Sequence, residues 1–341
     1  MTNFYNTLDD ALGKGFSIVS SFVLNKRSIA FFAAKAAEDN WNSILKLLAF
    51  IPGKKGGEWY AVELNGTWGR PWSGGMVKKP KQQFLFVGEN GDVVTVGGGT
   101  PFTPQNYIPN SRGDLFRNQN SNSLGNWDES SNHGLFFHNA KSIQGEIYTV
   151  NNRREVFRFT NNSWIQLKNG LPEYQNIVGQ SLGFRDIDGF SESDIYAAGG
   201  YGDLWHWNGK QWNMIDCPTN ASLKNICCGE DGLVYITMNK NSILCGRGDK
   251  WEFINQNKSD SFESIVWYKD RIYLSSSTQL FQIKNKIFSA AEEGEFRSLM
   301  WGKLSVGDDI MVAALDRRIG IYDGKEWTII SEGKKVSWQL N

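Results

Sequence analysis

A motif of nearly fixed length recurs five times between residues 148 and 327, and it constrains the fold more than any other feature of the sequence. Each copy runs from an apolar anchor residue to an aromatic residue 15 or 16 positions later. The anchors are Tyr148, Tyr196, Tyr235, Tyr273 and Val312, and the closing aromatics are Trp164, Trp212, Trp251, Phe288 and Trp327. Successive anchors are 38 to 48 residues apart, so one structural element is expected to repeat along the chain.

Each copy has the pattern of a small antiparallel sheet. The anchor strand leads through a short turn to a second apolar strand, and a pair such as Asn208-Gly209 then indicates a hairpin to a third strand. A further apolar strand precedes the anchor, as in KNICC at 224–228 and ESIVW at 263–267. Four strands in about 40 residues, repeated, predict an all-β chain built from the blades of a β-propeller. The closing tryptophans, which recur at one blade position, are expected to pack between blades.

The N-terminal half follows the pattern less closely. FLFVGENGDVVTVGGGTPF at 84–102 fits one blade, and RSIAFFAA at 27–34 with GEWYAVELNGTW at 57–68 suggests another. Apolar residues at helical spacing predict a helical insertion at about 35–50. A polar, Asn- and Ser-rich segment predicts a surface loop at about 103–135.

These patterns predict one propeller domain over residues 1–341, with about seven four-stranded blades or, alternatively, six. The final segment KVSWQL at 335–340 is expected to pair with an N-terminal strand, because such pairing removes open sheet edges.

The stretch SESDIYAAGGYGDLWHWNGKQW at 191–212 resembles the blade repeat of kelch-type and related bacterial propellers. Those repeats have a strand ending in glycines, followed by spaced aromatics, and Gly199-Gly200, Trp205 and Trp212 match them. The WD dipeptide does not recur from repeat to repeat, and the Ser-x-Asp-x-Gly-x-x-Trp box of sialidase-like propellers is absent. The resemblance supports a propeller over about residues 140–335 and transfers no activity.

Charge and targeting signals exclude some classes of partner. The chain has 36 basic and 36 acidic residues, so neither nucleic acid nor an anionic membrane is the expected partner. Its N-terminus is acidic, and FSIVSSFVL at 16–24 is too short and too interrupted for a signal peptide or a membrane span. We therefore expect a soluble cytoplasmic protein.

Cofactor and metal signals are weak throughout. The four cysteines show no Cys-x-x-Cys spacing and only three histidines accompany them, so unlinked thiols and no zinc site are expected. The acids of FRDIDGFSESD depart from the spacing of a calcium loop. The glycine-rich stretches lack the helix of a nucleotide cradle. We expect no cofactor and no metal.

Catalysis is not predicted, because no nucleophile motif is present. The alternative is a carbohydrate-binding or glycoside-hydrolysing propeller. Its carboxylates would be Asp186, Asp203 or Asp308, brought together from different blades.

Residues that do not repeat are the better candidates for a binding surface. In a propeller, the turns between second and third strands open on one face, and here they carry arginines and an aromatic residue, which protein interfaces favour. Two tryptophans that end innermost strands are expected near the same opening. The predicted partner-binding residues are Arg153, Arg154, Tyr201, Asp203, Trp267, Trp301, Asp316, Arg317 and Arg318.

The function predicted from these observations is a non-catalytic, monomeric propeller that binds another protein. In overall character the chain also resembles bacterial immunity proteins that neutralise a cognate toxin. On that resemblance, Arg153, Arg154, Arg317 and Arg318 would pair with acidic groups of the toxin, and Tyr201 would be an apolar anchor.

Overall fold

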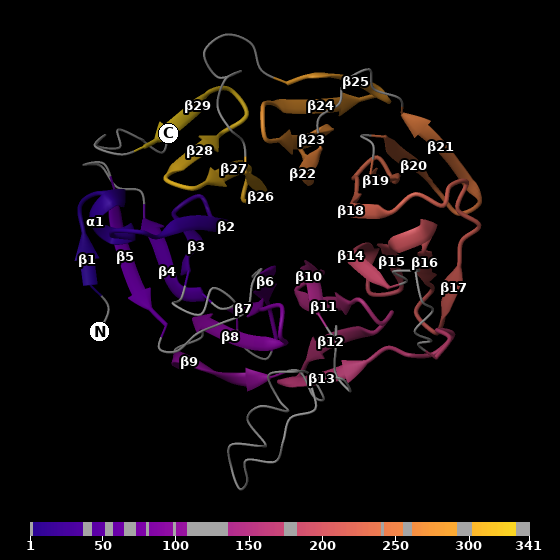
Figure 1. Ribbon diagram of the computed structural model, residues 1–341, viewed down its shortest axis with the longest axis horizontal. Helices are drawn as coiled ribbons and strands as arrows, with labels where there is room; N and C mark the ends of the chain where they lie inside the picture. The colour runs from indigo at the N-terminus through magenta and orange to yellow at the C-terminus, as the bar shows by residue number, and fades with distance from the viewer. Residues whose placement is uncertain are drawn as a thin grey trace, which may run out of the picture. The chain divides into compact units, whose positions relative to one another are not determined.

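The computed structural model in Figure 1 describes most of the chain. The described residues are 3–36, 43–51, 57–64, 73–79, 82–97, 100–107, 136–173, 183–239, 242–254, 261–291 and 302–331. Seven antiparallel sheets follow one another through these residues, and six of them have four strands that pair in sequence order. The prediction of an all-β propeller with about seven blades is confirmed.

Two compact units make up the chain, and each is described by itself. Unit 1 comprises Met1–Trp68, Gly229–Asp231 and Ile254–Asn341, and unit 2 comprises Gly69–Cys228 and Gly232–Phe253.

Unit 2 contains four sheets. The first is β6 (Ser73–Val77), β7 (Gln83–Val87), β8 (Asp92–Gly97) and β9 (Thr100–Tyr107). The second is β10 (Phe137–Ile143), β11 (Glu146–Asn151), β12 (Val156–Thr160) and β13 (Ser163–Gln166). The third is β14 (Phe184–Ser191), β15 (Asp194–Gly199), β16 (Leu204–Trp207) and β17 (Trp212–Met214), with a short 3-10 turn, η1 (Gly200–Gly202). The fourth is β18 (Leu223–Cys228), β19 (Val234–Met238), β20 (Ile243–Arg247) and β21 (Lys250–Ile254).

Unit 1 contains the remaining three sheets. Two are four-stranded: β22 (Phe262–Tyr268), β23 (Arg271–Ser276), β24 (Leu280–Lys284) and β25 (Ile287–Ala290), then β26 (Lys303–Gly307), β27 (Ile310–Leu315), β28 (Arg318–Tyr322) and β29 (Trp327–Ile330). The N-terminal sheet has five strands in the order β1-β5-β4-β3-β2. These are β1 (Asn3–Tyr5), β2 (Ser17–Asn25), β3 (Ser28–Ala36), β4 (Ser43–Ile51) and β5 (Glu58–Glu63).

The predicted helical insertion at about 35–50 is wrong. Residues 43–51 form β4, which pairs with β3 on one side and β5 on the other, and residues 37–42 lie outside the described part. The strand carries buried residues on both faces of the sheet, since Leu45 and Leu47 on one face and Leu48 on the other are all buried. In such a nearly continuous apolar run, some apolar residues also fall at the i, i+3, i+4 spacing of a helix, although the segment is a strand.

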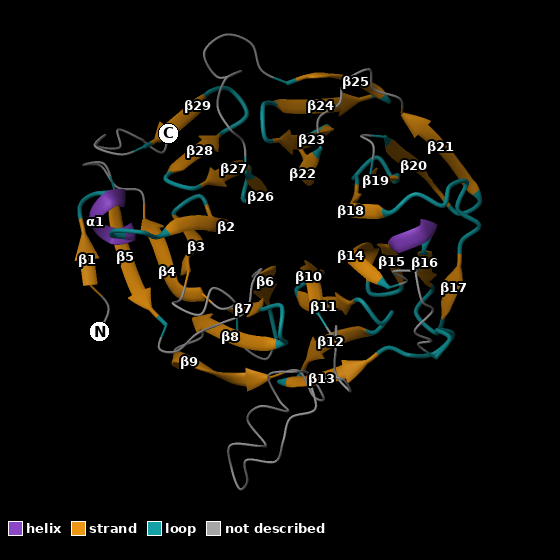
Figure 2. Cartoon of the chain, viewed as in Figure 1, coloured by secondary structure: helices purple, strands orange, loops and turns teal. Residues whose placement is uncertain are grey.

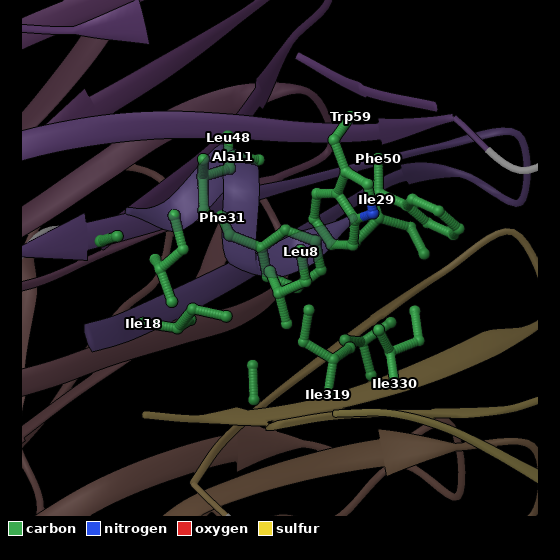
Figure 3. Packing of buried hydrophobic residues seen from close by; sticks show 14 of the residues in the cluster. Leu8, Ala11, Ile18, Ile29, Phe31, Leu48, Phe50, Trp59, Ile319 and Ile330 are labelled. Atoms are coloured by element: carbon green, nitrogen blue, oxygen red, sulfur yellow. The ribbon is translucent and has the colours of Figure 1, made fainter. Parts of the chain in front are cut away.

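The helix of unit 1 lies earlier in the chain. The helix α1 (Leu8–Leu12) begins after Thr7, whose Oγ1 accepts the Asp10 amide at 3.2 Å. Its buried residues join a core that the N-terminal sheet shares with β27, β28 and β29, as Figure 3 shows for Leu8, Trp59 and Ile319. Figure 2 shows α1 and η1 as short elements among strands.

The repeated positions form the cores between sheets. The five anchors, Tyr148, Tyr196, Tyr235, Tyr273 and Val312, are all buried. Trp212 is fully buried in a cluster with residues of both its own and the preceding sheet, and Trp164, Trp251 and Trp327 pack against three other clusters. The predicted packing role of the closing tryptophans is confirmed.

Two predictions fall partly or wholly outside the described residues. Residues 103–107 of the predicted surface loop belong to β9, and 108–135 are not described. The segment 335–340, which was expected to pair with an N-terminal strand, lies wholly outside the described residues.

Candidate partner-binding site

The predicted site residues of unit 2 gather at one end of its sheets. The turns 152–155 and 200–203 join the second strand to the third in two neighbouring sheets. Phe137 pairs with Asn151 and Phe184 with Gly199, so the first strands begin where these turns lie. We call this region, formed by the two turns and the first residues of β10, β14 and β18, the turn end of unit 2.

Tyr201 is held on the surface in a strained conformation. Its backbone is left-handed (φ 55°, ψ 37°), and its side chain is 48% exposed. On either side, Gly199 donates to the Asp203 carbonyl at 2.8 Å and Gly202 to the Ala221 carbonyl at 2.9 Å. Left-handed backbone is unfavourable for a bulky residue, and it persists only where the surroundings impose it. An exposed aromatic fixed in this way is preorganised for contact.

Asp203 is buried beneath Tyr201 and binds Arg154 of the neighbouring sheet. Its carboxylate accepts Nε of Arg154 at 2.6 Å and Nη2 at 3.0 Å, and it also accepts the indole N–H of Trp205 at 2.7 Å. The Arg154 guanidinium lies 5.9 Å from the Trp205 ring centre. Because Asp203 has no exposed surface to offer, we expect this pair to fix the two turns relative to each other.

The turns also meet through backbone contacts at Gly183. This residue precedes β14, and its carbonyl accepts the Gly200 amide at 3.2 Å. A Cβ atom at Gly183 would lie 2.1 Å from the Asn152 carbonyl oxygen, and φ is +133°, so only glycine fits. Asn152 adjoins Arg153, which is half-buried. Arg153 and Tyr201 therefore belong to one contiguous surface of unit 2.

In unit 1 the turn between β27 and β28 carries the other predicted residues. Arg317 donates to the carbonyls of Gly13 and Phe16 at 3.1 and 3.3 Å, and to Asp9 at 2.8 Å. Asp316 accepts the Ser17 hydroxyl at 2.6 Å. These contacts tie the turn to the N-terminal segment. Arg318 is exposed and has no partner among the residues that the structure describes.

Trp267 was expected to lie at the same end of its sheet as the turn between the second and third strands, and this expectation is wrong. Trp267 pairs with Ile272, next to the first turn of the sheet, whereas the turn between β23 and β24 adjoins Ser276, which pairs with Phe262. Because the strands are antiparallel, the end of β22 and the 276–279 turn lie at opposite ends of the sheet. Trp301 is outside the described residues.

Side-chain links between neighbouring first strands were not predicted. Ser73 accepts the Ala140 amide at 2.7 Å, Asp186 the Ile226 amide at 2.8 Å, and Ser264 the Leu304 amide at 3.1 Å. Asp186 and Ser264 belong to a repeated pattern of an apolar residue, any residue, then Asn, Asp or Ser. The pattern recurs as FHNA, FRDI, LKNI and FESI, and comparison of the copies would have found it.

A partly buried cluster of three charged groups accompanies one of these links. Lys141 on β10 lies 3.3 Å from Asp186 and 3.6 Å from Asp188, both on β14. The two carboxylates raise the pKa of Lys141 against the effect of its burial. Burial raises the pKa of the Asp186 carboxyl, and Lys141 with two backbone donors opposes that rise. The charges hold adjacent sheets together.

The acids considered for calcium or sugar chemistry are likewise paired. Glu192 contacts Arg158 at 3.0 Å, and Asp194 contacts His206 at 2.9 Å as well as Arg247. Asp308 accepts the Lys26 amide at 2.9 Å. Among the described residues, no group of three potential metal ligands is found.

No disulfide joins the four cysteines. Burial raises the pKa of Cys217, and that of Cys228 well above its usual value, so these thiols are poor nucleophiles at neutral pH. In the described part of the chain, no helix has the length and apolar character needed to cross a membrane.

Comparison with known proteins identifies a relative. The immune protein Tsi7 of Pseudomonas aeruginosa is 30% identical over 267 residues, which cover 76% of this chain and 80% of Tsi7. This chain belongs to the Tsi7 family. No model of a protein family matches the chain, so the kelch-like resemblance remains a prediction for this member of the Tsi7 family.

Solved structures agree on the fold. The WD40 propeller domain of Doa1 matches with a TM-score of 0.61 at 10% identity, covering 92% of this chain and 95% of that one. The WD40 repeats of RRP9 match with a TM-score of 0.59 at 10% identity, covering 98% and 95%. Sqt1 of Saccharomyces cerevisiae matches with a TM-score of 0.57 at 12% identity, covering 94% and 87%. These similarities place this chain among the β-propellers, and they concern the fold alone.

Proposed function

We propose that this chain is an immunity protein that binds a cognate toxin and neutralises it by covering the toxin's active cleft, without catalysis of its own. Membership of the Tsi7 family carries the proposal, because Tsi7 is named an immune protein. The fold supports it, since a propeller presents variable turns on a rigid framework of sheets.

The residues proposed to contact the toxin divide by unit. In unit 2 they are Tyr201 and Arg153, and in unit 1 they are Asp316 and Arg318. Arg154, Asp203 and Arg317 serve the same surfaces indirectly, because their charged groups hold the turns in place. A rigid exposed tyrosine beside an arginine is the composition that dominates binding energy at protein interfaces.

We also propose that the protein acts as a monomer in the bacterial cytoplasm. Four cysteines without a disulfide suit a reducing compartment. Light scattering during gel filtration of the purified protein would measure the mass, and a dimer would contradict the monomer.

Affinity purification from the native cell tests the function. We expect one protein retained in stoichiometric amount, and expression of that protein without this chain should arrest growth. Tyr201→Ala and Arg318→Glu should each weaken protection, whereas Lys210→Glu, in the exposed turn at the opposite end of the same sheet as Tyr201, should not. If no stoichiometric partner is retained, or growth is arrested equally with and without this chain, the immunity function is wrong.

A further inference from the structure

Four sheets share a β-bulge at the start of the first strand. In β10, Phe137 pairs with Asn151 and Asn139 with Val150, so His138 is left outside the ladder. The corresponding extra residues are Arg185 in β14, Lys224 in β18 and Glu263 in β22. A bulge turns a side chain away from the regular alternation of a strand, and proteins place bulges next to binding sites.

In unit 2 the bulged residues of three consecutive sheets are all of basic type. His138, Arg185 and Lys224 are half-buried at the turn end. The acids of β14 do not compensate Arg185, because Asp186 and Asp188 are engaged by Lys141 and by backbone donors of β18. Among the described residues, no carboxylate pairs with Arg185.

The surroundings of His138 disfavour the charged form of its imidazole. Burial, and secondly the charge of Arg185, lower the pKa of His138 to about 4. The imidazole is therefore neutral at pH 7, and the positive charge of this edge rests on Arg185 and Lys224.

The backbone segments that carry Arg185 and Lys224 contact the turn of the exposed tyrosine. Arg185 is two residues from Gly183, which contacts Asn152 and Gly200 of the two turns. The segment that leads into β18 contacts the same turn, because Ala221 accepts the Gly202 amide. The turn end thus combines Arg153, Arg185 and Lys224 with Tyr201.

We propose that Arg185 and Lys224, together with Arg153 and Tyr201, form a cationic site that binds an acidic segment of the toxin. This inference rests on the proposed function and names the chemistry of the partner's contact. Guanidinium and ammonium groups bind carboxylates through charge-assisted hydrogen bonds, while the tyrosine supplies the apolar contact. The links made by Asp186 hold the backbone beside Arg185, so little conformational entropy is lost on binding.

Charge reversal tests the site against a matched control. The variant Arg185→Glu/Lys224→Glu is compared with Lys210→Glu/Lys250→Glu, which makes the same charge change in exposed residues at the opposite end of unit 2. Calorimetry with the purified toxin should show affinity reduced at least about tenfold in the first variant and unchanged in the second. The salt dependence of the affinity should also become shallower in the first variant only. Circular dichroism and thermal unfolding of both variants confirm that each is folded.

Two probes identify the chemistry independently of the toxin. A short poly-L-glutamate peptide should bind the wild-type protein more tightly than the double variant, and an oligonucleotide of equal charge should not compete better than the peptide. Equal toxin affinities for the two double variants would overturn the site, as would preferential binding of the oligonucleotide. If the wild-type protein protects no cell and binds no toxin, the proposed function fails, and the peptide experiment alone still decides whether the site binds acidic polypeptide.

Discussion

The turn 152–155 of unit 2 and the turn between β27 and β28 of unit 1 each carry two neighbouring arginines that were predicted to bind a partner. In each turn, one of the two arginines forms an ion pair within the protein. In unit 2, Arg154 binds Asp203, whose side chain is 2% exposed. In unit 1, Arg317 binds Asp9, whose side chain is 31% exposed. Arg153 and Arg318, the neighbours in sequence, remain at the surface. Adjacent residues in a turn thus divide into one arginine whose charged group holds the turn and one that lies nearer the surface.

The difference in burial between Asp203 and Asp9 predicts different energetic costs. An ion pair out of water is expensive to break, because the remaining charge stays buried, whereas an exposed pair contributes little. Four variants compare the two turns and their surroundings, and they are considered in order of decreasing effect on stability.

Asp203→Ala should have the largest effect. It leaves the Arg154 guanidinium and the Trp205 indole without their acceptor, so we expect a loss of about 3–5 kcal/mol in the free energy of unfolding. Urea titration followed by tryptophan fluorescence measures it. Arg154→Ala/Asp203→Ala serves as the control and should be less destabilised than the sum of the two single variants. A loss of less than about 1 kcal/mol in the free energy of unfolding would mean that the Asp203 ion pair contributes no more than an exposed one.

Acid should affect the turn end of unit 2 through His138. Its pKa of about 4 in the folded protein lies below the value of 6.5 for an unperturbed imidazole. The folded state therefore binds fewer protons between these values, and this contribution to stability is lost as pH falls from about 6.5 to about 4. Urea titrations at several pH values should show that acid lowers the free energy of unfolding by about 3 kcal/mol less in His138→Gln than in the wild type. Parallel profiles of the two proteins would contradict the assignment.

Arg317→Ala should cost about 1–2 kcal/mol, less than Asp203→Ala. The variant removes two bonds to carbonyls and one partly exposed ion pair. Urea titration under the same conditions allows a direct comparison, with Arg318→Ala as the control expected to lie within about 0.5 kcal/mol of wild type. If Arg317→Ala proves as costly as Asp203→Ala, exposure does not explain the difference between the two turns.

Tyr201→Ala should leave stability within about 0.5 kcal/mol, because the ring is half exposed and the backbone strain is unchanged. The same variant should weaken toxin binding by about 2 kcal/mol or more, as expected of a central aromatic contact. Thermal unfolding and calorimetry on one sample measure both. A stability loss that accounts for the binding loss would make Tyr201 a structural residue.

The sequence predicts the propeller well because the repeat fixes strand number and spacing. The five anchors and their closing aromatics identify strands that the structure then pairs in order. The N-terminal sheet was harder, since β4 is buried on both faces and its apolar run fits two periodicities. Local pattern cannot distinguish a central strand from a buried helix when neither face is polar.

The candidate site could be predicted only in part. The turns were found because they are the positions where the repeats differ. The pairing of Arg154 with Asp203 joins residues 49 positions apart on different sheets, and no local signal encodes it. Arg185 and Lys224 were overlooked because a bulge changes the direction of one side chain without changing the apolar pattern around it.

The links between first strands have a consequence for how such a chain diverges. In each link a side chain on one sheet accepts a hydrogen bond from the main chain of the next, as Ser73, Asp186 and Ser264 do. Every residue except proline carries that donor, so only the accepting position is specified by sequence. One sheet can therefore change its residues at these donor positions during evolution, or be exchanged for another in an engineered chimaera, without loss of this hydrogen bond to the preceding sheet.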